Sequence, residues 1–248
     1  MNWQAIVLVT MGLMLTVHDA WADKDREEKM RTARKRMVQE IEVDVMETSR
    51  YIGRGQLSAE VMRVMEEVPR HEFVPSYEQG AAYLNRPLPI GYGQTISQPY
   101  IVALMTDLLA VSKEGKILEV GAGSGYQAAV LSRLVNEVHS IEIIPELAKE
   151  CRERLARLGY ANVTIHQGDG YYGLQSEAPF DAIVVTAAAT SIPPPLVQQL
   201  KPGGRLVIPV GTPFAVQHLM LVEKNEQGEI AMRQVLPVQF VPLTGKRE

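Results

Sequence analysis

The sequence predicts an α/β fold with a doubly wound, mostly parallel sheet of the Rossmann-like kind. Apolar runs and amphipathic segments alternate regularly after Lys116, which is typical of such sheets. The run at residues 182–185, Ala-Ile-Val-Val, is apolar throughout and indicates a strand buried on both faces. Residues 117–125, Ile-Leu-Glu-Val-Gly-Ala-Gly-Ser-Gly, predict a buried strand that leads directly into a glycine-rich turn and a helix. Ligands of these folds bind at the carboxyl ends of the strands.

The N-terminal third is predicted to be helical and then irregular. Residues 24–52 carry apolar positions at helical spacing and predict one or two amphipathic helices. Ser58 can cap a second helix that runs through Val68 and is stopped by Pro69. Prolines and glycines then give residues 68–99 an irregular path, and a loop of this length is uncommon unless it binds something.

The rest of the chain alternates between strands and helices. A helix is expected after Pro99. Beyond it the predicted strands are 117–120, 137–142, 163–167, 181–186 and 205–210, and the predicted helices are 125–135, 145–158 and 195–200. The last strands, 217–222 and 230–238, flank Asn225-Glu-Gln-Gly228 and predict an antiparallel hairpin at the sheet edge.

The chain of 248 residues, 46% hydrophobic, is long enough for one substantial core. We expect a single domain at residues 23–248, preceded by a leader at residues 1–22. Within that domain we expect N-terminal helices and a substrate loop over 23–115, a cofactor-binding core over 116–211, and a C-terminal hairpin over 212–248. We expect a monomer.

The leader has the pattern of a secretory signal peptide. An apolar run from Ala5 to Val17 is too short to span a bilayer comfortably, and Ala20-Trp-Ala22 is a small-x-small cleavage pattern. Residues 1–4 lack Lys and Arg, so an uncleaved anchor or a wrongly assigned start codon remains an alternative. The leader predicts export to a periplasm or to the medium, with no stable membrane association after cleavage.

Charge and cysteine content exclude few functions. A formal net charge of −4 argues against a general nucleic-acid binder, which would carry a basic face. Cys151 is the only cysteine, so no disulfide can form within the chain, and its helical register predicts core packing. No convincing set of carboxylates gathers at the strand ends, so no metal is expected.

The glycine turn indicates a cofactor site. Gly121, Gly123 and Gly125 allow a tight bend and let a ligand approach backbone N–H groups at a helix start, and Ala122 and Ser124 complete the turn. The order G-x-G-x-G, with Glu119 two places before it, favours S-adenosylmethionine over a nicotinamide dinucleotide. A purely structural turn remains the alternative.

Two further strand ends carry acidic residues. Glu142 lies 21 residues after Gly121 and can accept hydrogen bonds from both ribose hydroxyls, or it can cap the helix at Pro145. Asp169, beside Gly170, can receive an adenine amine or can be an ordinary turn residue.

The loop at residues 87–97 is the other candidate for chemistry. It presents the hydroxyls of Thr95 and Ser97 beside flexible glycines. Ser97 could equally cap the helix that begins near Pro99, and composition does not choose between the two.

Over roughly residues 40–245 the chain resembles the protein-L-isoaspartate O-methyltransferase family. The resemblance implies a S-adenosylmethionine-dependent enzyme that methylates the free α-carboxylate of L-isoaspartyl residues, the damage products of Asn and Asp, as the first step of repair. Its partners would then be damaged proteins and peptides. Seven segments carry the resemblance, at residues 68–75, 87–91, 94–97, 118–130, 168–170, 178–189 and 199–211.

The resemblance also implies roles for individual residues. Ser97 matches the position usually assigned as the active-site residue, and Thr95 and Ile96 would shape the same substrate pocket. Ala187 and Ala188 would lie near the transferred methyl group. The cofactor would be held by Glu119, Gly121, Ala122, Gly123, Ser124, Gly125, Glu142, Asp169 and Gly170. His71 also matches the family pattern, but we expect it to be structural.

Other enzyme classes fit less well. A dehydrogenase would need G-x-G-x-x-G, and an amino-methyltransferase of nucleic acids would need Asn/Asp-Pro-Pro-Tyr where this chain has Thr186-Ala-Ala-Ala189. A methyltransferase of another small carboxylate and an exported, non-catalytic binding protein remain alternatives. Because S-adenosylmethionine is made in the cytoplasm, a cytoplasmic location is the alternative to export.

Overall fold

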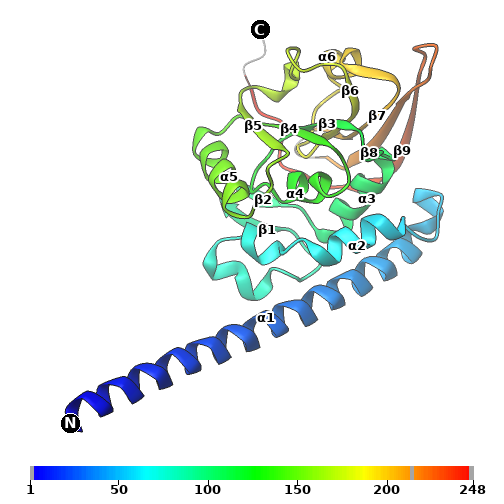
Figure 1. Cartoon of the computed structure of the whole chain (residues 1–248). Coiled ribbons are helices and arrows are strands. Elements are labelled where there is room, and N and C mark those ends of the chain that lie inside the picture. The colour runs from blue at the N-terminus through cyan, green and yellow to red at the C-terminus, as the bar shows by residue number, and fades with distance from the viewer. Residues whose placement is uncertain (1–2, 213–214, 246–248) are drawn as a thin grey trace.

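The computed structural model describes the backbone of residues 3–212 and 215–245 and the side chains of residues 24–212 and 215–245 (Figure 1). Helix α1 (Trp3–Ile52) is one continuous helix, where the sequence left one or two open. The predicted leader lies outside the residues whose side chains are described. Within the part of the chain with described side chains, no helix is long and apolar enough to cross a membrane.

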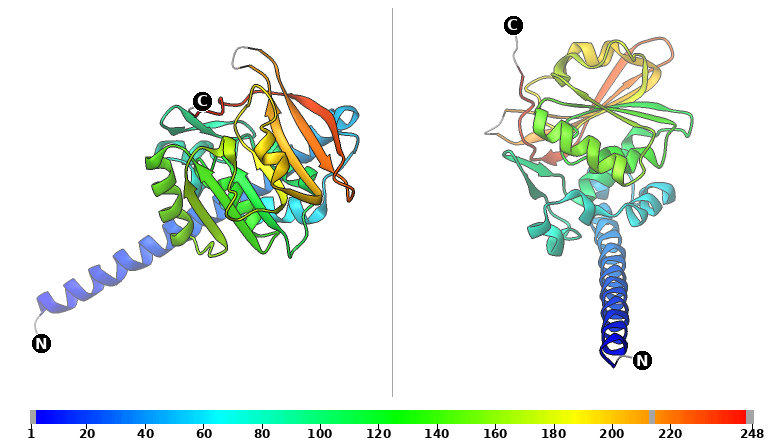
Figure 2. Two further views of the ribbon diagram at one scale, coloured as in Figure 1. Left: turned by 90° about the horizontal axis from the view of Figure 1, so that it is seen from above. Right: turned by 60° about the vertical axis from the view of Figure 1, so that its left-hand side comes forward.

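Three helices form a layer beside the sheet. Met37, Ile41 and Val45 of α1 are buried at helical spacing. Helix α1 contacts α2 (Ala59–Glu67) and α3 (Pro99–Leu109), and Figure 2 shows the ribbon from two further sides. The Ser58 side chain accepts a hydrogen bond from the Val61 N–H group at 3.3 Å, which confirms the predicted cap.

The segment between α2 and α3 is more regular than its composition predicts. It contains two 3-10 helices, η1 (Arg70–Phe73) and η2 (Ser76–Ala81), and an antiparallel pair, β1 (Leu88–Gly91) and β2 (Gln94–Ile96). The expectation of a loop without strands was therefore wrong. Pro89 lies inside β1, where proline ordinarily argues against a strand, and both strands are too short to show an alternating pattern.

The main sheet has seven strands in the order β5-β4-β3-β6-β7-β8-β9. The first five are parallel and the last two antiparallel, which confirms the doubly wound sheet with its C-terminal hairpin. The strands are β3 (Lys116–Val120), β4 (Glu137–Glu142), β5 (Val163–Gln167), β6 (Phe180–Val185), β7 (Leu200–Val210), β8 (Gln217–Lys224) and β9 (Ile230–Val238).

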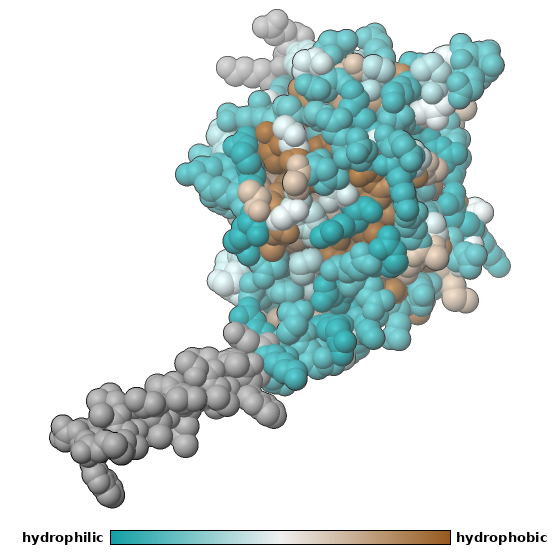
Figure 3. Space-filling model, in the orientation of Figure 1, coloured by the Kyte–Doolittle hydropathy of each residue, from teal (hydrophilic) through white to brown (hydrophobic). Residues whose placement is uncertain are grey.

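Helices cover both faces of this sheet. Strand β6 shows this directly, because Ala182 and Val184 belong to the core under α1–α5, whereas Ile183 and Val185 belong to the core that includes Leu196 of α6. Hydrophilic side chains cover most of the face seen in Figure 3. The covering helices after α3 are α4 (Tyr126–Ser132), α5 (Pro145–Arg157) and α6 (Pro194–Gln198), and a short 3-10 helix, η3 (Gly170–Tyr172), follows β5.

Two details differ from the sequence prediction. Strand β7 begins at Leu200, five residues earlier than expected, because Pro202-Gly-Gly204 forms an irregularity within the strand instead of preceding it. Helix α4 is shorter than predicted and ends at Ser132. Cys151 lies on α5 and is a free thiol that is fully buried in the hydrophobic core, as its register predicts.

Candidate active site

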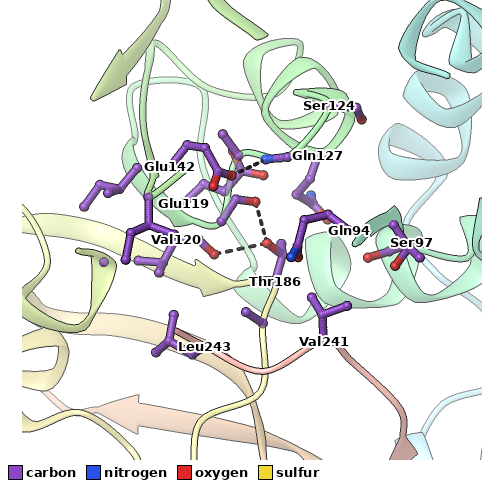
Figure 4. Close-up of a pocket in the computed structure, with 18 of the residues that line it drawn as sticks. Gln94, Ser97, Glu119, Val120, Ser124, Gln127, Glu142, Thr186, Val241 and Leu243 are labelled. Atoms are coloured by element: carbon purple, nitrogen blue, oxygen red, sulfur yellow. Dashed lines mark hydrogen bonds between the residues drawn. The ribbon is translucent and has the colours of Figure 1, made fainter. Parts of the chain in front are cut away.

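A pocket opens at the carboxyl ends of β3, β4 and β6, where the strand order reverses direction around β3. Figure 4 shows residues from these strand ends, from the β2–α3 segment and from the C-terminal segment converging on it. Its lining consists of residues 94–97, Val102, residues 119–124, Tyr126, Gln127, residues 141–144, Gly170, Thr186, Ala187 and residues 241–244.

The glycine turn is fixed by a close approach between two strands. Gly121 has a φ of 97°, and a Cβ atom at this position would lie 2.5 Å from the Thr186 hydroxyl oxygen. That hydroxyl donates to the Gly121 carbonyl at 2.6 Å. The N–H groups of Gly121 and Ala122 both donate to the Ile141 carbonyl. Only glycine fits at position 121, and β3, β4 and β6 are tied together there.

Glu142 holds the turn from the neighbouring strand. One carboxylate oxygen accepts the Gly123 N–H group at 2.8 Å, and the other accepts the Ile144 N–H group at 2.9 Å at the start of α5. Glu142 therefore lines the pocket and also accepts a hydrogen bond from the residue that precedes α5, although it is not the N-cap residue of that helix. Its predicted contact with the ribose stays a prediction.

Glu119 is fully buried at the floor of the pocket. The Ser140 hydroxyl donates to its Oε2 atom, whereas its Oε1 atom has no hydrogen-bond partner among the described residues. Burial raises the pKa of Glu119 to about 8, so the carboxyl is largely protonated at neutral pH. The Ser124 hydroxyl is likewise buried and without a partner within the described chain. The buried Tyr126 hydroxyl also lacks a partner there, so three residues that line this pocket carry orphaned polar atoms. Such atoms fit a ligand with polar groups of its own.

Ser97 lies between this pocket and a second one. The second pocket has a volume of about 790 Å³ and extends from α1 to the segment after β9. The two pockets share Thr95, Ser97, Thr186 and Val241. Ser97 does not cap α3, because the N-cap residue is Gln98. Its location therefore favours the interpretation as a functional residue over the interpretation as a cap.

The remaining predicted residues divide into two groups. Ile96 and Ala187 line the first pocket with the members of the glycine turn up to Ser124, and Gly170 does so from η3. Gly125, Asp169 and Ala188 do not line it. Gly125 is the N-cap residue of α4, and the Asp169 side chain accepts the Tyr171 N–H group as a turn residue does.

Ala188 instead forms backbone hydrogen bonds with residues close to the C-terminus. Its N–H group donates to the Val241 carbonyl at 2.8 Å, and its carbonyl accepts the Leu243 N–H group at 2.8 Å. This pairing lays residues 241–244 along the pocket. Neither residues 241–244 nor Thr186 is predicted as a site residue from the sequence. No motif marks residues 241–244, whereas the hydroxyl of Thr186 at the end of β6 was a signal that could have been used.

His71 stays outside both pockets. It is buried, and its Nδ1 atom lies 2.7 Å from the Tyr83 hydroxyl. Burial lowers the pKa of this imidazole, which favours the neutral form. The position fits the expected structural role. Among the described residues, no cluster of His, Cys, Asp and Glu could hold a metal ion.

The doubly wound sheet, the glycine turn and the acidic end of β4 together define the class of S-adenosylmethionine-dependent methyltransferases. Residues 42–248 match the family model described as protein-L-isoaspartate(D-aspartate) O-methyltransferase. The chain belongs to this family.

Individual relatives agree with this assignment. Protein-L-isoaspartate O-methyltransferase 2 of Syntrophobacter fumaroxidans is 65% identical over 213 residues, which are 86% of each chain. The protein of the same name from a Polaromonas species is 61% identical over 85% of this chain and 100% of its own.

Solved structures show the same fold. A protein-L-isoaspartate O-methyltransferase superposes with a TM-score of 0.74 at 29% identity, over 86% of this chain and 66% of its own. A putative Plasmodium falciparum enzyme in complex with S-adenosyl-L-homocysteine gives a TM-score of 0.65 at 26% identity, over 81% of this chain and 97% of its own.

The buried Glu119 carboxyl predicts a pH dependence of stability. Its pKa is about 8 in the folded protein and near 4.5 in the unfolded chain. Its contribution to the free energy of unfolding is therefore complete below about pH 4.5 and is lost as the pH rises through 8. The Glu119→Gln variant has no carboxyl group at this position, so its free energy of unfolding does not fall for this reason. Urea unfolding between pH 5 and 9 should therefore show the wild type falling relative to the variant, by at most about 1.4 kcal/mol per pH unit. A constant difference across this range would contradict the raised pKa.

Proposed function

We propose that this protein transfers a methyl group from S-adenosylmethionine to the free α-carboxylate of L-isoaspartyl residues in damaged proteins and peptides. The observation that carries the proposal is the location of Ser97, in a chain of this family, on the wall shared by the glycine-turn pocket and the larger pocket. One pocket would hold the cofactor and the other the peptide, with transfer at their border.

The residues of the first pocket fit this cofactor. Glu142 and the glycine turn would hold its ribose and amino-acid parts, and the orphaned atoms of Glu119 and Ser124 would receive hydrogen bonds from it or donate to it. When bound, S-adenosylmethionine supplies a methyl group on a positively charged sulfur.

The substrate needs no general base. A carboxylate with a pKa near 3.9 is already ionised at neutral pH, so Ser97 would donate a hydrogen bond to it instead of removing a proton. The protein's contribution is then orientation and exclusion of water, and orientation is worth up to about 7 to 11 kcal/mol. A carboxylate oxygen would form the new bond to the methyl carbon while the bond from that carbon to the cofactor sulfur breaks. The products would be a methyl ester and S-adenosyl-L-homocysteine, which keeps the sulfur's electron pair.

The larger pocket suits a flexible peptide. Its walls combine apolar side chains with polar groups such as Thr48 and Gln98, and its volume of about 790 Å³ lies within the range of ordinary ligand sites. Residues 236–241 form one of its walls. We infer that an extended segment around the isoaspartyl residue binds here, and that the protein acts as a monomer.

The proposed activity is tested with two peptides that differ at one residue. Methyl transfer from labelled S-adenosylmethionine should occur to a peptide with L-isoaspartate and not to its L-aspartate twin. Only the former presents a free α-carboxylate, because its main chain continues through the side-chain carboxyl group. Protein lacking residues 1–22 is compared with the full chain. Labelling of neither peptide would favour a binding protein or another carboxylate substrate.

Two substitutions separate the roles of the pockets. Ser97→Ala should lower kcat by about 10- to 100-fold with little change in S-adenosylmethionine affinity, because the hydroxyl acts on the substrate side. Glu142→Ala should mainly raise the Kd for S-adenosylmethionine, measured by calorimetry. Equal losses of turnover and affinity in Ser97→Ala, or an unchanged Kd in Glu142→Ala, would contradict these roles.

We further propose that residues 1–22 direct export and are removed. The support is the short apolar run and the Ala20-Trp-Ala22 pattern before a charged segment. Mass spectrometry of the protein from cell fractions should find a chain that begins at Asp23 outside the cytoplasm. Recovery of a chain with an intact leader from the cytoplasm alone would refute export, and it would agree with the place where the cofactor is made.

A further inference from the structure

Arg70 is a buried cation that the proposed chemistry does not use. It lies in η1, its exposed fraction is 0%, and no ion pair among the described residues includes it. Burial lowers its pKa to about 10, so it remains charged at neutral pH. A buried charge without an anion is costly, which makes its contacts informative.

Its guanidinium joins two backbone carbonyls. The Nε atom donates to the Ala82 carbonyl at 2.8 Å, and one terminal nitrogen donates to the Ser97 carbonyl at 2.7 Å. The other terminal nitrogen has no partner within the described chain. The planar fork of arginine can hold both carbonyls at once, whereas a lysine ammonium is a single point charge.

The hydrogen bond to Ser97 falls where regular structure gives no support. Ser97 follows the last residue of β2 and precedes the N-cap residue of α3. It therefore belongs to neither element, and the regular hydrogen bonds of the strand pair and of the helix do not fix it. A peptide group is planar, and a bond to its carbonyl therefore fixes the orientation of the Ser97–Gln98 peptide. The bond therefore restrains the Ser97 main chain, from which the side chain extends.

Arg70 also contacts a residue of the first pocket, the one proposed to hold the cofactor. Its guanidinium carbon lies 4.8 Å from the centre of the Tyr126 ring. Tyr126 is the first residue of α4, follows the glycine turn directly and lines the first pocket. Phe73, from the same 3-10 helix as Arg70, packs edge-on against this ring. One buried side chain thus connects the glycine turn with the Ser97 segment.

We propose that Arg70 is a positioning residue that fixes the Ser97 hydroxyl relative to the glycine turn. It acts through the Ser97 backbone and does not itself contact the substrate. The proposal rests on the proposed methyl transfer for its kinetic consequence, whereas the fixing of the Ser97 segment can be measured without it.

The test compares Arg70→Lys with Arg34→Lys. Arg34 is also buried, donates to a backbone carbonyl, that of Glu67, at 2.8 Å, and stacks near an aromatic ring, but it lines neither pocket. Arg70→Lys should lower kcat for the isoaspartyl peptide by about tenfold or more, because small misplacements of reacting groups are expensive. The Kd for S-adenosyl-L-homocysteine should change by less than about threefold. Arg34→Lys should leave kcat within about twofold.

A double mutant distinguishes positioning from general damage. In the Ser97→Ala background, Arg70→Lys should lower kcat by less than about twofold, since the hydroxyl it positions is already absent. The proposal is overturned if the double mutant shows the product of the two single losses of kcat. It is also overturned if Arg34→Lys lowers kcat as much as Arg70→Lys does. Should Arg70→Lys fail to fold, Arg70→Gln keeps one donor without a buried charge and takes its place.

Hydrogen exchange provides a reading that does not depend on activity. The amides of residues 94–98 and of Tyr100 should exchange faster in Arg70→Lys than in the wild type or in Arg34→Lys, and unchanged exchange would overturn the positioning role. If the wild type methylates no isoaspartyl peptide, the proposed function fails, while this exchange difference still decides whether Arg70 fixes the Ser97 segment.

Discussion

The contact between Gly121 and Thr186 is the constraint on which the rest of the site depends. Strands β3 and β6 come so close at their carboxyl ends that a Cβ atom at position 121 would lie 2.5 Å from the Thr186 hydroxyl oxygen. The chain leaves the sheet at this point and continues into α4, and within this turn the Gly123 N–H group donates to Glu142. A methyl group added at Gly121 would therefore disturb three strands at once.

Two carboxyl groups near this contact differ because their surroundings differ. Glu142 accepts two backbone N–H groups, whereas Glu119 has one hydroxyl partner, no exposure and a raised pKa. The pocket thus contains a carboxyl group that is satisfied by the main chain and a largely neutral carboxylic acid with one unpartnered oxygen. The neutral acid can donate a hydrogen bond as well as accept one.

Much of this arrangement could be predicted from the sequence, because strand ends and glycine turns leave local patterns. The bounds of β4 and β5 agree with prediction to the residue. The β1–β2 pair was missed because its strands are short and one contains Pro89. The placement of residues 241–244 depends on Ala188, more than fifty residues earlier, and no local pattern encodes such a partner. The contact between Arg70 and Ser97 is of the same long-range kind.

The single thiol of the chain acquires a use from where it is buried. A Cβ atom at Gly125 would lie 2.7 Å from the Cys151 sulfur, so the sulfur packs directly beneath the end of the glycine turn. Burial also holds the pKa of this thiol at about 12. An alkylating reagent can therefore reach it only when the turn and α5 separate. The rate at which Cys151 is alkylated therefore reports how often the glycine turn opens, without an engineered probe in the protein.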